Sequence, residues 1–318
     1  MAELTLFFAT DIHGSETCWR KFLNAAKVYK ADVMVLGGDM TGKVIVPIYT
    51  TQNGWQATWK EQDYNINTKA ELDELVPAIR GPGAYPYVTT REEIDAVVGD
   101  AEAEHALFTK LKMDVLRGWM ALADERLAGT GVRCFVMAGN DDPYEIDEAL
   151  GSARTVVNTD RLIVQLTDRI AMLSFGASTV TPWHSPRELS EDEYLRQVEP
   201  LVGQLAAPER AIFNFHDPPY NSDIDVAPQI DDLLRVQYRA TGEPIYAPVG
   251  SRSVRALVEK YQPMLGLHGH VHEGRGRYKM GRTVGFNPGS DYTEGMLRGV
   301  LIKLSDHKGV REYSFTMG

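Results

Sequence analysis

The sequence predicts a layered α/β sandwich with mixed sheets, and three features of the 318-residue chain predict it. Short apolar segments bounded by polar residues or glycine are typical of strands buried on both faces. A segment with apolar residues at helical spacing lies between the first two of these strands. Later segments separated by turn residues add strands of antiparallel character. Strands and helices in this arrangement pack as layers around a shared core.

The elements follow in order along the chain. Buried strands are expected at LTLFFA (4–9), DVMVLG (32–37), RCFVMA (133–138), AIFNF (211–215) and PMLGL (263–267). The helix expected between the first two has the apolar stripe Trp19, Phe22, Leu23 and Ala26. Ser15 before it is a residue type that favours helix N-caps. The antiparallel strands are expected in RLIVQL, RIAMLSF, RTVGFN, GVLIKL and EYSFTM.

Residues 43–128 interrupt this core. KVIVPIYTT, QNG and WQATWKEQ predict a β-hairpin with a turn at Asn53-Gly54. Two helical patterns follow at about 69–79 and 100–127, around the loop GPGAYPYVTT. Because the segment begins and ends against core strands, we expect one domain spanning residues 1–318, with an inserted cap at 43–128.

Composition and charge exclude several classes of function. The mean hydropathy of -0.27 and the 43% content of hydrophobic residues predict a globular protein with a sizeable core. No transmembrane or signal-peptide pattern is found, so we expect a cytoplasmic protein that does not enter membranes. Cys18 and Cys134 are expected to be buried and unpaired, which fits a reducing compartment. The net charge of -11 disfavours broad nucleic-acid binding and leaves small anionic substrates open.

Side chains that can bind metal follow all five predicted buried strands. They are Asp11 and His13 in TDIHG, Asp39 in GGDM, Asn140 in AGND, His216 in NFHD, and His270 and His272 in HGHVH. Each residue alone would be interpreted as a turn aspartate or a surface histidine. Because open α/β sheets bind ligands at the carboxyl ends of their strands, the whole set predicts a metal site at that edge.

The seven side chains offer more ligand atoms than one ion needs. Four imidazoles, two carboxylates and one amide exceed the requirement of one four- to six-coordinate ion, whereas two divalent ions sharing a bridging carboxylate would use them all. Without a thiolate, the set suits manganese, iron or zinc better than calcium. Two ions about 3.5–4 Å apart activate water and clamp the oxygens of a phosphoryl group. Hydrolysis of a small phosphorylated substrate is the expected chemistry.

The motifs DxH, GD, GN, H and GHxH follow one another along the chain, and in this order they resemble the motifs of the calcineurin-like metallophosphoesterase superfamily. The resemblance covers residues 5–290 and includes NPGS at 287–290. It implies a four-layer α/β/β/α sandwich with two mixed central sheets. It also implies a binuclear phosphoesterase in which a metal-bridging hydroxide attacks phosphomonoester, phosphodiester or nucleotide-type substrates. The implied ligands are Asp11, His13, Asp39 and His272 for one ion, and Asp39, Asn140, His216 and His270 for the other, with Asp39 bridging.

One position departs from the resemblance. The usual motif is GNHD or GNHE, whose histidine steadies the transition state or protonates the leaving oxygen, and Asp141 stands in its place. Asp141 is interpreted in three ways: a proton donor with a raised pKa, a group that holds Asn140 or bound water, or a helix N-cap before PYEIDEAL. His184 in ASTVTPWHSPRE is a candidate replacement imidazole, or alternatively an exposed structural histidine. Asp141 and His184 are therefore the candidate catalytic residues.

Two further alternatives bear on function. GGDMTGKV, residues 37–44, matches the start of a phosphate-binding P-loop, but Val44 replaces the serine or threonine that must reach magnesium, so a P-loop is rejected. The alternative to an enzyme is a non-catalytic metal-binding scaffold or protein-interaction module, because some proteins of this superfamily lack the same histidine and serve in protein association. The retention of all seven ligands favours the enzyme. The sequence leaves the substrate, the native metals and the oligomeric state open.

Overall fold

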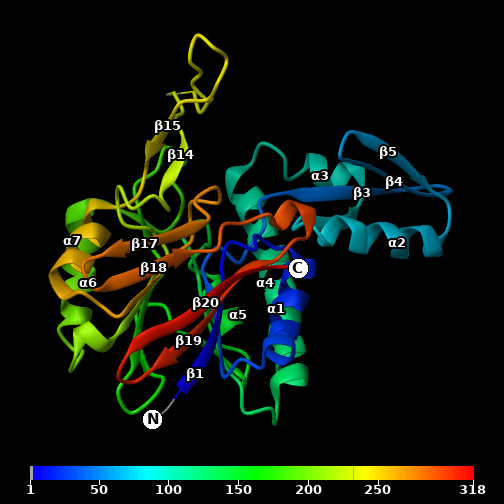
Figure 1. Ribbon diagram of the computed structural model, residues 1–318. Coiled ribbons are helices and arrows are strands. Elements are labelled where there is room, and N and C mark those ends of the chain that lie inside the picture. The colour runs from blue at the N-terminus through cyan, green and yellow to red at the C-terminus, as the bar shows by residue number, and fades with distance from the viewer. Residues whose placement is uncertain (1–2, 232) are drawn as a thin grey trace.

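Two mixed sheets lie face to face at the centre of the molecule (Figure 1). The computed structural model describes residues 3–231 and 233–318. In spatial order, the first sheet contains β20 (Gly309–Met317), β19 (Arg298–Ser305), β1 (Glu3–Ala9), β2 (Val33–Gly37), β7 (Arg133–Met137) and β8 (Val156–Asn158). The second contains β17 (Gly276–Met280), β18 (Thr283–Asn287), β16 (Leu265–Leu267), β13 (Ile212–Phe215), β10 (Ala171–Phe175) and β9 (Ile163–Gln165). The predicted buried and antiparallel strands are all found among them.

Helices cover the outer face of each sheet. The first sheet carries α1 (Glu16–Tyr29), α4 (Ala101–Leu127) and α5 (Ile146–Leu150), and the second carries α6 (Glu191–Val202) and α7 (Arg252–Tyr261). The order of layers is therefore helix, sheet, sheet, helix, which confirms the predicted fold class.

The first strand shows why the core strands are apolar on both faces. Leu6 and Phe8 belong to the core between the two sheets, whereas Phe7 and Ala9 pack beneath the helices. Successive side chains point to opposite faces of a strand, so a strand between two layers needs apolar residues at every position.

Helix α1 begins and packs as its sequence predicts. The Ser15 hydroxyl accepts a hydrogen bond from the backbone N–H of Cys18 at 3.2 Å, which caps the helix. The Trp19 ring stacks on Trp119 of α4 with centroids 5.2 Å apart. Cys18 and Cys134 are both buried and unpaired, as expected.

The insertion at 43–128 forms a third sheet with its own apolar cluster. Its strands lie in the order β5 (Gln62–Ile66), β4 (Gly54–Trp59), β3 (Ile45–Thr51) and β6 (Tyr85–Thr89), and α2 (Lys69–Arg80) packs against them. A short helix α3 (Arg91–Asp95) follows. The insertion is not one unit, because α4 packs in the core beneath the first sheet. Its role as a cap over the site stays a prediction.

Two details of the insertion correct the sequence analysis. The segment GPGAYPYVTT, predicted to be a loop, contains β6, which pairs in parallel with β3. The turn of the first hairpin lies at Gln52 and Asn53, because Thr51 pairs with Gly54. Gly54 has a φ of 139°, and a Cβ there would lie 2.0 Å from the Ile66 carbonyl oxygen. The glycine therefore serves the close approach of β5 and not the turn.

Short elements complete the chain. They are β11 (Ser178–Thr179), β12 (Glu188–Leu189), β14 (Val226–Pro228), β15 (Tyr246–Pro248) and the 3-10 turns η1 (Pro208–Arg210) and η2 (Tyr292–Glu294). The antiparallel pair β14 and β15 projects away from the layered body (Figure 1). Within the described residues, no helix has the length and apolar character needed to cross a membrane.

Candidate metal centre

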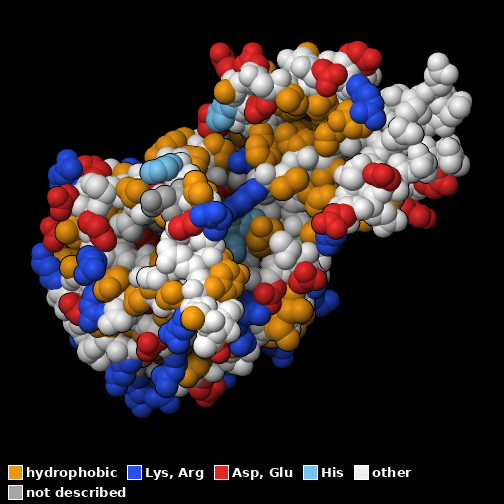
Figure 2. All heavy atoms as spheres, turned by 90° about the horizontal axis from the view of Figure 1, so that it is seen from above, with side chains coloured by type: hydrophobic (Ala, Val, Ile, Leu, Met, Phe, Trp, Pro, Cys, Tyr) orange, Lys and Arg blue, Asp and Glu red, His pale blue; other side chains and the backbone are white. Residues whose placement is uncertain are grey.

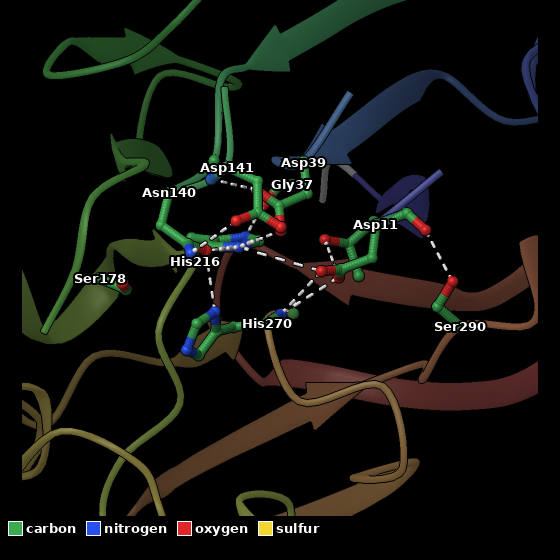
Figure 3. A network of polar contacts seen from close by, with 12 residues as sticks. Asp11, Gly37, Asp39, Asn140, Asp141, Ser178, His216, His270 and Ser290 are labelled. Carbon is green, nitrogen blue, oxygen red and sulfur yellow. Dashed lines mark hydrogen bonds and ion pairs between the residues drawn. The ribbon is translucent and has the colours of Figure 1, made fainter. Parts of the chain in front are cut away.

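All seven predicted ligands lie in the segments that follow five core strands at their carboxyl ends. Asp11 and His13 follow β1, Asp39 follows β2, Asn140 follows β7, His216 follows β13, and His270 and His272 follow β16. Figure 3 shows the side chains of five of them turned toward one another: Asp11, Asp39, Asn140, His216 and His270. The ligands thus converge where the carboxyl ends of strands from both sheets meet, and strand carboxyl ends are where the sequence predicts the site.

The ligand atoms form three overlapping groups, and within each group all of them lie within 4.8 Å of one another. The groups are Asp11 with His13 and His272, Asp39 with His216 and His270, and His13 with Asp39 and Asp141. Asn140 joins the second group, because its Oδ1 lies 2.8 Å from His270 Nδ1 and 3.1 Å from His216 Nε2. The groups match the two implied ligand sets, with Asp141 as an additional carboxylate.

Asp39 lies between the two sets. Its Oδ2 is 3.6 Å from His13 Nε2 and 3.4 Å from His216 Nε2. A carboxylate in this position can bridge two ions, which is the role that the resemblance implies for Asp39.

The tautomer of His216 is fixed for metal binding. Its Nδ1 lies 2.8 Å from the Gly37 carbonyl oxygen, an acceptor, so Nδ1 carries a proton and Nε2, which faces the ligand cluster, is the nitrogen that can bind metal once it is deprotonated. His268 is buried, with its Nδ1 within 2.9 Å of the Phe215 carbonyl oxygen and 3.1 Å of that of Asp217. These contacts hold the backbone on both sides of His216, the kind of support that orients metal-binding histidines.

Four of the seven ligands have unusual backbone conformations. The φ angles are 53° at Asp11, 38° at His13, 50° at Asp39 and 65° at His270. A left-handed conformation costs a non-glycine residue on the order of 1–3 kcal/mol, and such strain is concentrated at functional sites.

Glycines next to the ligands allow neighbouring loops to touch. A Cβ on Gly139 would lie 2.1 Å from Asp39 Oδ1, and one on Gly269 would lie 2.3 Å from Asp11 Oδ2. The Asp11 carboxylate also accepts hydrogen bonds from the Thr10 hydroxyl at 2.6 Å and from the backbone N–H of His270 at 3.0 Å. The glycines of AGND and HGHVH therefore position the carboxylates against adjacent backbone.

The clustered carboxylates and imidazoles shift one another's pKa. Burial lowers the pKa of His13 to about 3, with help from the charges of His272 and Lys43. Burial and the charge of His216 likewise lower the pKa of His270 to about 3, so both imidazoles are neutral and can donate lone pairs. Burial would lower the pKa of His216 too, but Asp39 and Asp11 raise it to about 10. The carboxylates thus attract positive charge to the centre.

The residues present fit a pair of divalent ions. The donor set is imidazole, carboxylate and amide oxygen, which suits first-row divalent metals. The buried Nδ1 of His13 has no hydrogen-bond partner among the described residues, and it faces the Asp141 carboxylate at 4.0 Å. Buried polar atoms are rarely left unpaired, so the orphaned nitrogen is a further sign that a ligand belongs here.

The structure contradicts two of the three roles predicted for Asp141. Burial raises its pKa, but the adjacent Lys43 ammonium outweighs burial and lowers the pKa to about 2, opposite to a proton donor with a raised pKa. Asp141 is not a helix N-cap, because α5 begins at Ile146 and its N-cap residue is Glu145. The third role fits, since Asn140 Nδ2 donates to Asp141 Oδ1 at 3.4 Å. The Ser185 hydroxyl donates to the same oxygen at 2.6 Å.

The neighbouring Asp142 holds two ligand loops together. Its buried carboxylate accepts hydrogen bonds from the backbone N–H groups of Met40, Thr41 and Gly139 at 2.8–2.9 Å. The buried Arg187 donates to the Asp142 carbonyl oxygen at 2.8 Å, so it ties this loop to the segment that carries Ser185. Sequence analysis missed these links because they join residues distant in the chain.

His184 is not among the clustered metal-binding groups of the described residues. His184 is exposed, and its φ is 51°. Its backbone N–H donates to the Thr181 carbonyl oxygen at 3.3 Å. The adjacent Ser185 contacts Asp141 instead. Catalysis by His184 therefore stays a prediction.

Comparisons with known proteins support the fold. No protein-family model matches the chain. The uncharacterized protein MJ1162 of Methanocaldococcus jannaschii is 28% identical over 152 residues, which are 47% of this chain. The match covers 61% of that protein, so the chain spans about three fifths of the length of this relative.

Solved structures align with the whole chain. One crystal structure has a TM-score of 0.59 and 16% identity, covering 100% of this chain and 99% of that chain. The protein TT1561 of Thermus thermophilus has a TM-score of 0.54 and 12% identity, with the same coverage. The chain shares their fold. At these identities the likeness shows the fold alone. A dimetal phosphatase from Danio rerio aligns less closely, with a TM-score of 0.49 and 8% identity over 98% of both chains.

Proposed function

We propose that the chain is a binuclear metal-dependent phosphoric ester hydrolase that acts on a small phosphorylated substrate. The overlap of the ligand groups at His13 and Asp39 is the observation that carries this proposal. Two separate ions would need no shared residue, whereas a pair close enough to act on one phosphoryl group needs a ligand between them.

The proposal assigns the two ions to the two sides of Asp39. Asp11, His13 and His272 would hold one ion, and Asn140, His216 and His270 would hold the other. Manganese, iron and zinc are the expected metals, because the set contains imidazoles and carboxylates but no thiolate. When bound, such a pair polarises phosphoryl oxygens and activates water at neutral pH.

A substrate would approach from the side of His272 and Lys43. The side chain of His272 is 31% exposed and that of Lys43 is 51% exposed, whereas those of Asp11 and Asp39 are at most 3% exposed. On the face seen from above, lysine or arginine atoms lie beside partly hidden histidine atoms, next to a hydrophobic area (Figure 2). Monoesters, diesters and nucleotides are all candidates, and a cytoplasmic location stays part of the proposal.

Hydrolysis of p-nitrophenyl phosphate and bis-p-nitrophenyl phosphate tests the proposal. The metal-free chain is reconstituted separately with manganese, ferrous iron, zinc and nickel. We expect turnover of one ester with at least one metal, and loss of turnover after chelation. Metal binding without hydrolysis of either ester would instead favour the non-catalytic scaffold.

A further inference from the structure

Lys43 lies directly beside the candidate metal centre. Its ammonium forms an ion pair with Asp141 Oδ2. The same carboxylate oxygen is 4.0 Å from His13 Nδ1, and the backbone N–H of Asp141 donates to Asp39 Oδ1 at 3.0 Å. Asp141 therefore links the ammonium to His13 and to the shared Asp39.

The backbone on both sides of Lys43 is fixed. The Gly42 N–H donates to the Tyr85 hydroxyl at 2.8 Å, and the Tyr85 N–H donates to the Val44 carbonyl oxygen at 2.8 Å. The preceding Thr41 is held by the Asp142 carboxylate through its backbone N–H and its hydroxyl. The lysine side chain thus starts from an ordered position, as a group that must meet a substrate in a defined geometry would require.

The Lys43 side chain is more exposed than that of its partner. The Lys43 side chain is 51% exposed, whereas that of Asp141 is 18% exposed. A lysine ammonium has three N–H donors, and Asp141 does not use all of them. Because Ser185 binds the other Asp141 oxygen, the carboxylate is fixed from the opposite side. The remaining donors of Lys43 can bind an anion that enters from solvent.

We propose that Lys43 binds a non-bridging phosphoryl oxygen of the substrate, and that Asp141 positions its ammonium. This inference rests on the proposed phosphoesterase function. It explains the acid at the position where the resemblance implies a histidine, because the cationic donor comes from residue 43 and the acid holds it. The ammonium keeps its proton throughout, and acts by stabilising negative charge on the phosphoryl group.

The test compares Lys43→Met with Lys69→Met, both loaded with the most active metal. Lys69 is a matched control, because it also forms an exposed ion pair, with Asp73 on α2. Removing one such donor costs on the order of 10²–10³ in turnover. We expect that fall in kcat/KM for Lys43→Met, weaker binding of inorganic phosphate by calorimetry, and two ions retained by elemental analysis. Lys69→Met should match the wild type in all three.

The outcomes separate the two proposals. If the wild type hydrolyses esters and Lys43→Met has wild-type kcat/KM and phosphate affinity, the role of Lys43 is refuted and the phosphoesterase stands. A loss of activity that follows a loss of metal would also refute it. If the wild type binds phosphate but hydrolyses nothing, the phosphoesterase fails, and the phosphate affinity of Lys43→Met still decides the role of Lys43. A wild type that neither hydrolyses an ester nor binds phosphate overturns both.

A double-mutant cycle tests the positioning role of Asp141. Asp141→Asn should lower kcat/KM more in the wild type than in the Lys43→Met background, since coupled residues are not additive. Lys43→Arg should restore part of the activity, because it keeps a cationic donor. An equal loss from Asp141→Asn in both backgrounds would show that Asp141 acts independently of Lys43.

Discussion

The two halves of the candidate metal centre are supported differently. On one side, His216 is fully buried, its Nδ1 is bound at the Gly37 carbonyl, and Asn140 lies between it and His270. On the other side, the His272 side chain is 31% exposed, and the buried Nδ1 of His13 has no partner in the part of the chain that the structure describes. Ligands fixed in advance lose less freedom on binding. The ion at His216 should therefore be held tightly, and the ion at His272 should exchange more readily.

Loss of the shared carboxylate should have the largest effect, because it removes the feature common to both halves. Asp39→Asn is expected to bind neither ion stoichiometrically. A bound metal contributes several kcal/mol to catalysis, so hydrolysis should fall by on the order of 10³-fold or more. Elemental analysis and ester hydrolysis measure the two effects, with Asp73→Asn on α2 as the exposed control. Retention of two ions by Asp39→Asn would show that Asp39 is not the ligand shared by the two halves.

Substitution of one histidine in each half tests the difference directly. His216→Ala should abolish the tighter of two binding events in a calorimetric titration with zinc or manganese. His272→Ala should affect the weaker event and leave the tighter one measurable. Similar profiles for the two variants would show that the halves are equivalent, contrary to the contrast in burial.

The support behind His216 should have a smaller effect. His268→Phe removes the imidazole contacts to the Phe215 and Asp217 carbonyl oxygens. Loss of such outer contacts typically costs about 10–100-fold in metal affinity, and we expect this loss at the tighter ion. Tyr278→Phe is the control, since it removes only the hydroxyl 3.1 Å from His268 Nε2. Thermal unfolding of both variants would show whether lost packing explains the change instead.

The pH dependence should be the smallest effect and should not distinguish the halves. Each half contains one histidine whose pKa is raised despite burial: Asp39 and Asp11 raise that of His216 to about 10, and Asp11 raises that of His272. A proton on either ring must leave before metal binds, so affinity rises with pH and falls as pH decreases. At pH values below the pKa of each ring, one displaced proton per ion gives about a tenfold change in affinity per pH unit. Calorimetry in buffers of different ionisation enthalpy counts these protons, and a release at one half only would contradict the symmetry.

The position of the candidate ligands at the strand ends could be predicted because the signals are local. An apolar run predicts each core strand, and the polar residues directly after it lie at the strand end whatever the rest of the chain does. Asp11 and His216 could therefore be placed without knowing how their strands pair. Helices α6 and α7 were not predicted, although Ser190 and Ser251 are N-caps of a type that sequence reasoning can use.

The contacts around Asp141 could not be predicted in the same way. Lys43 is 98 positions and Ser185 is 44 positions away in the chain, so their meeting depends on how the loops pack. Strand β6 was missed for a related reason. Glycine and proline in GPGAYPYVTT indicate a turn, and pairing with β3 overrides that local preference.

The double attachment of Tyr85 has a mechanical consequence. Tyr85 belongs to the inserted sheet, yet its hydroxyl and its backbone N–H bind the residues on either side of Lys43. The inserted sheet is thus attached directly to the backbone that carries the ammonium. Substitutions that disturb β6 are therefore expected to alter the position of the positive charge beside the metal ligands, although β6 itself supplies no ligand.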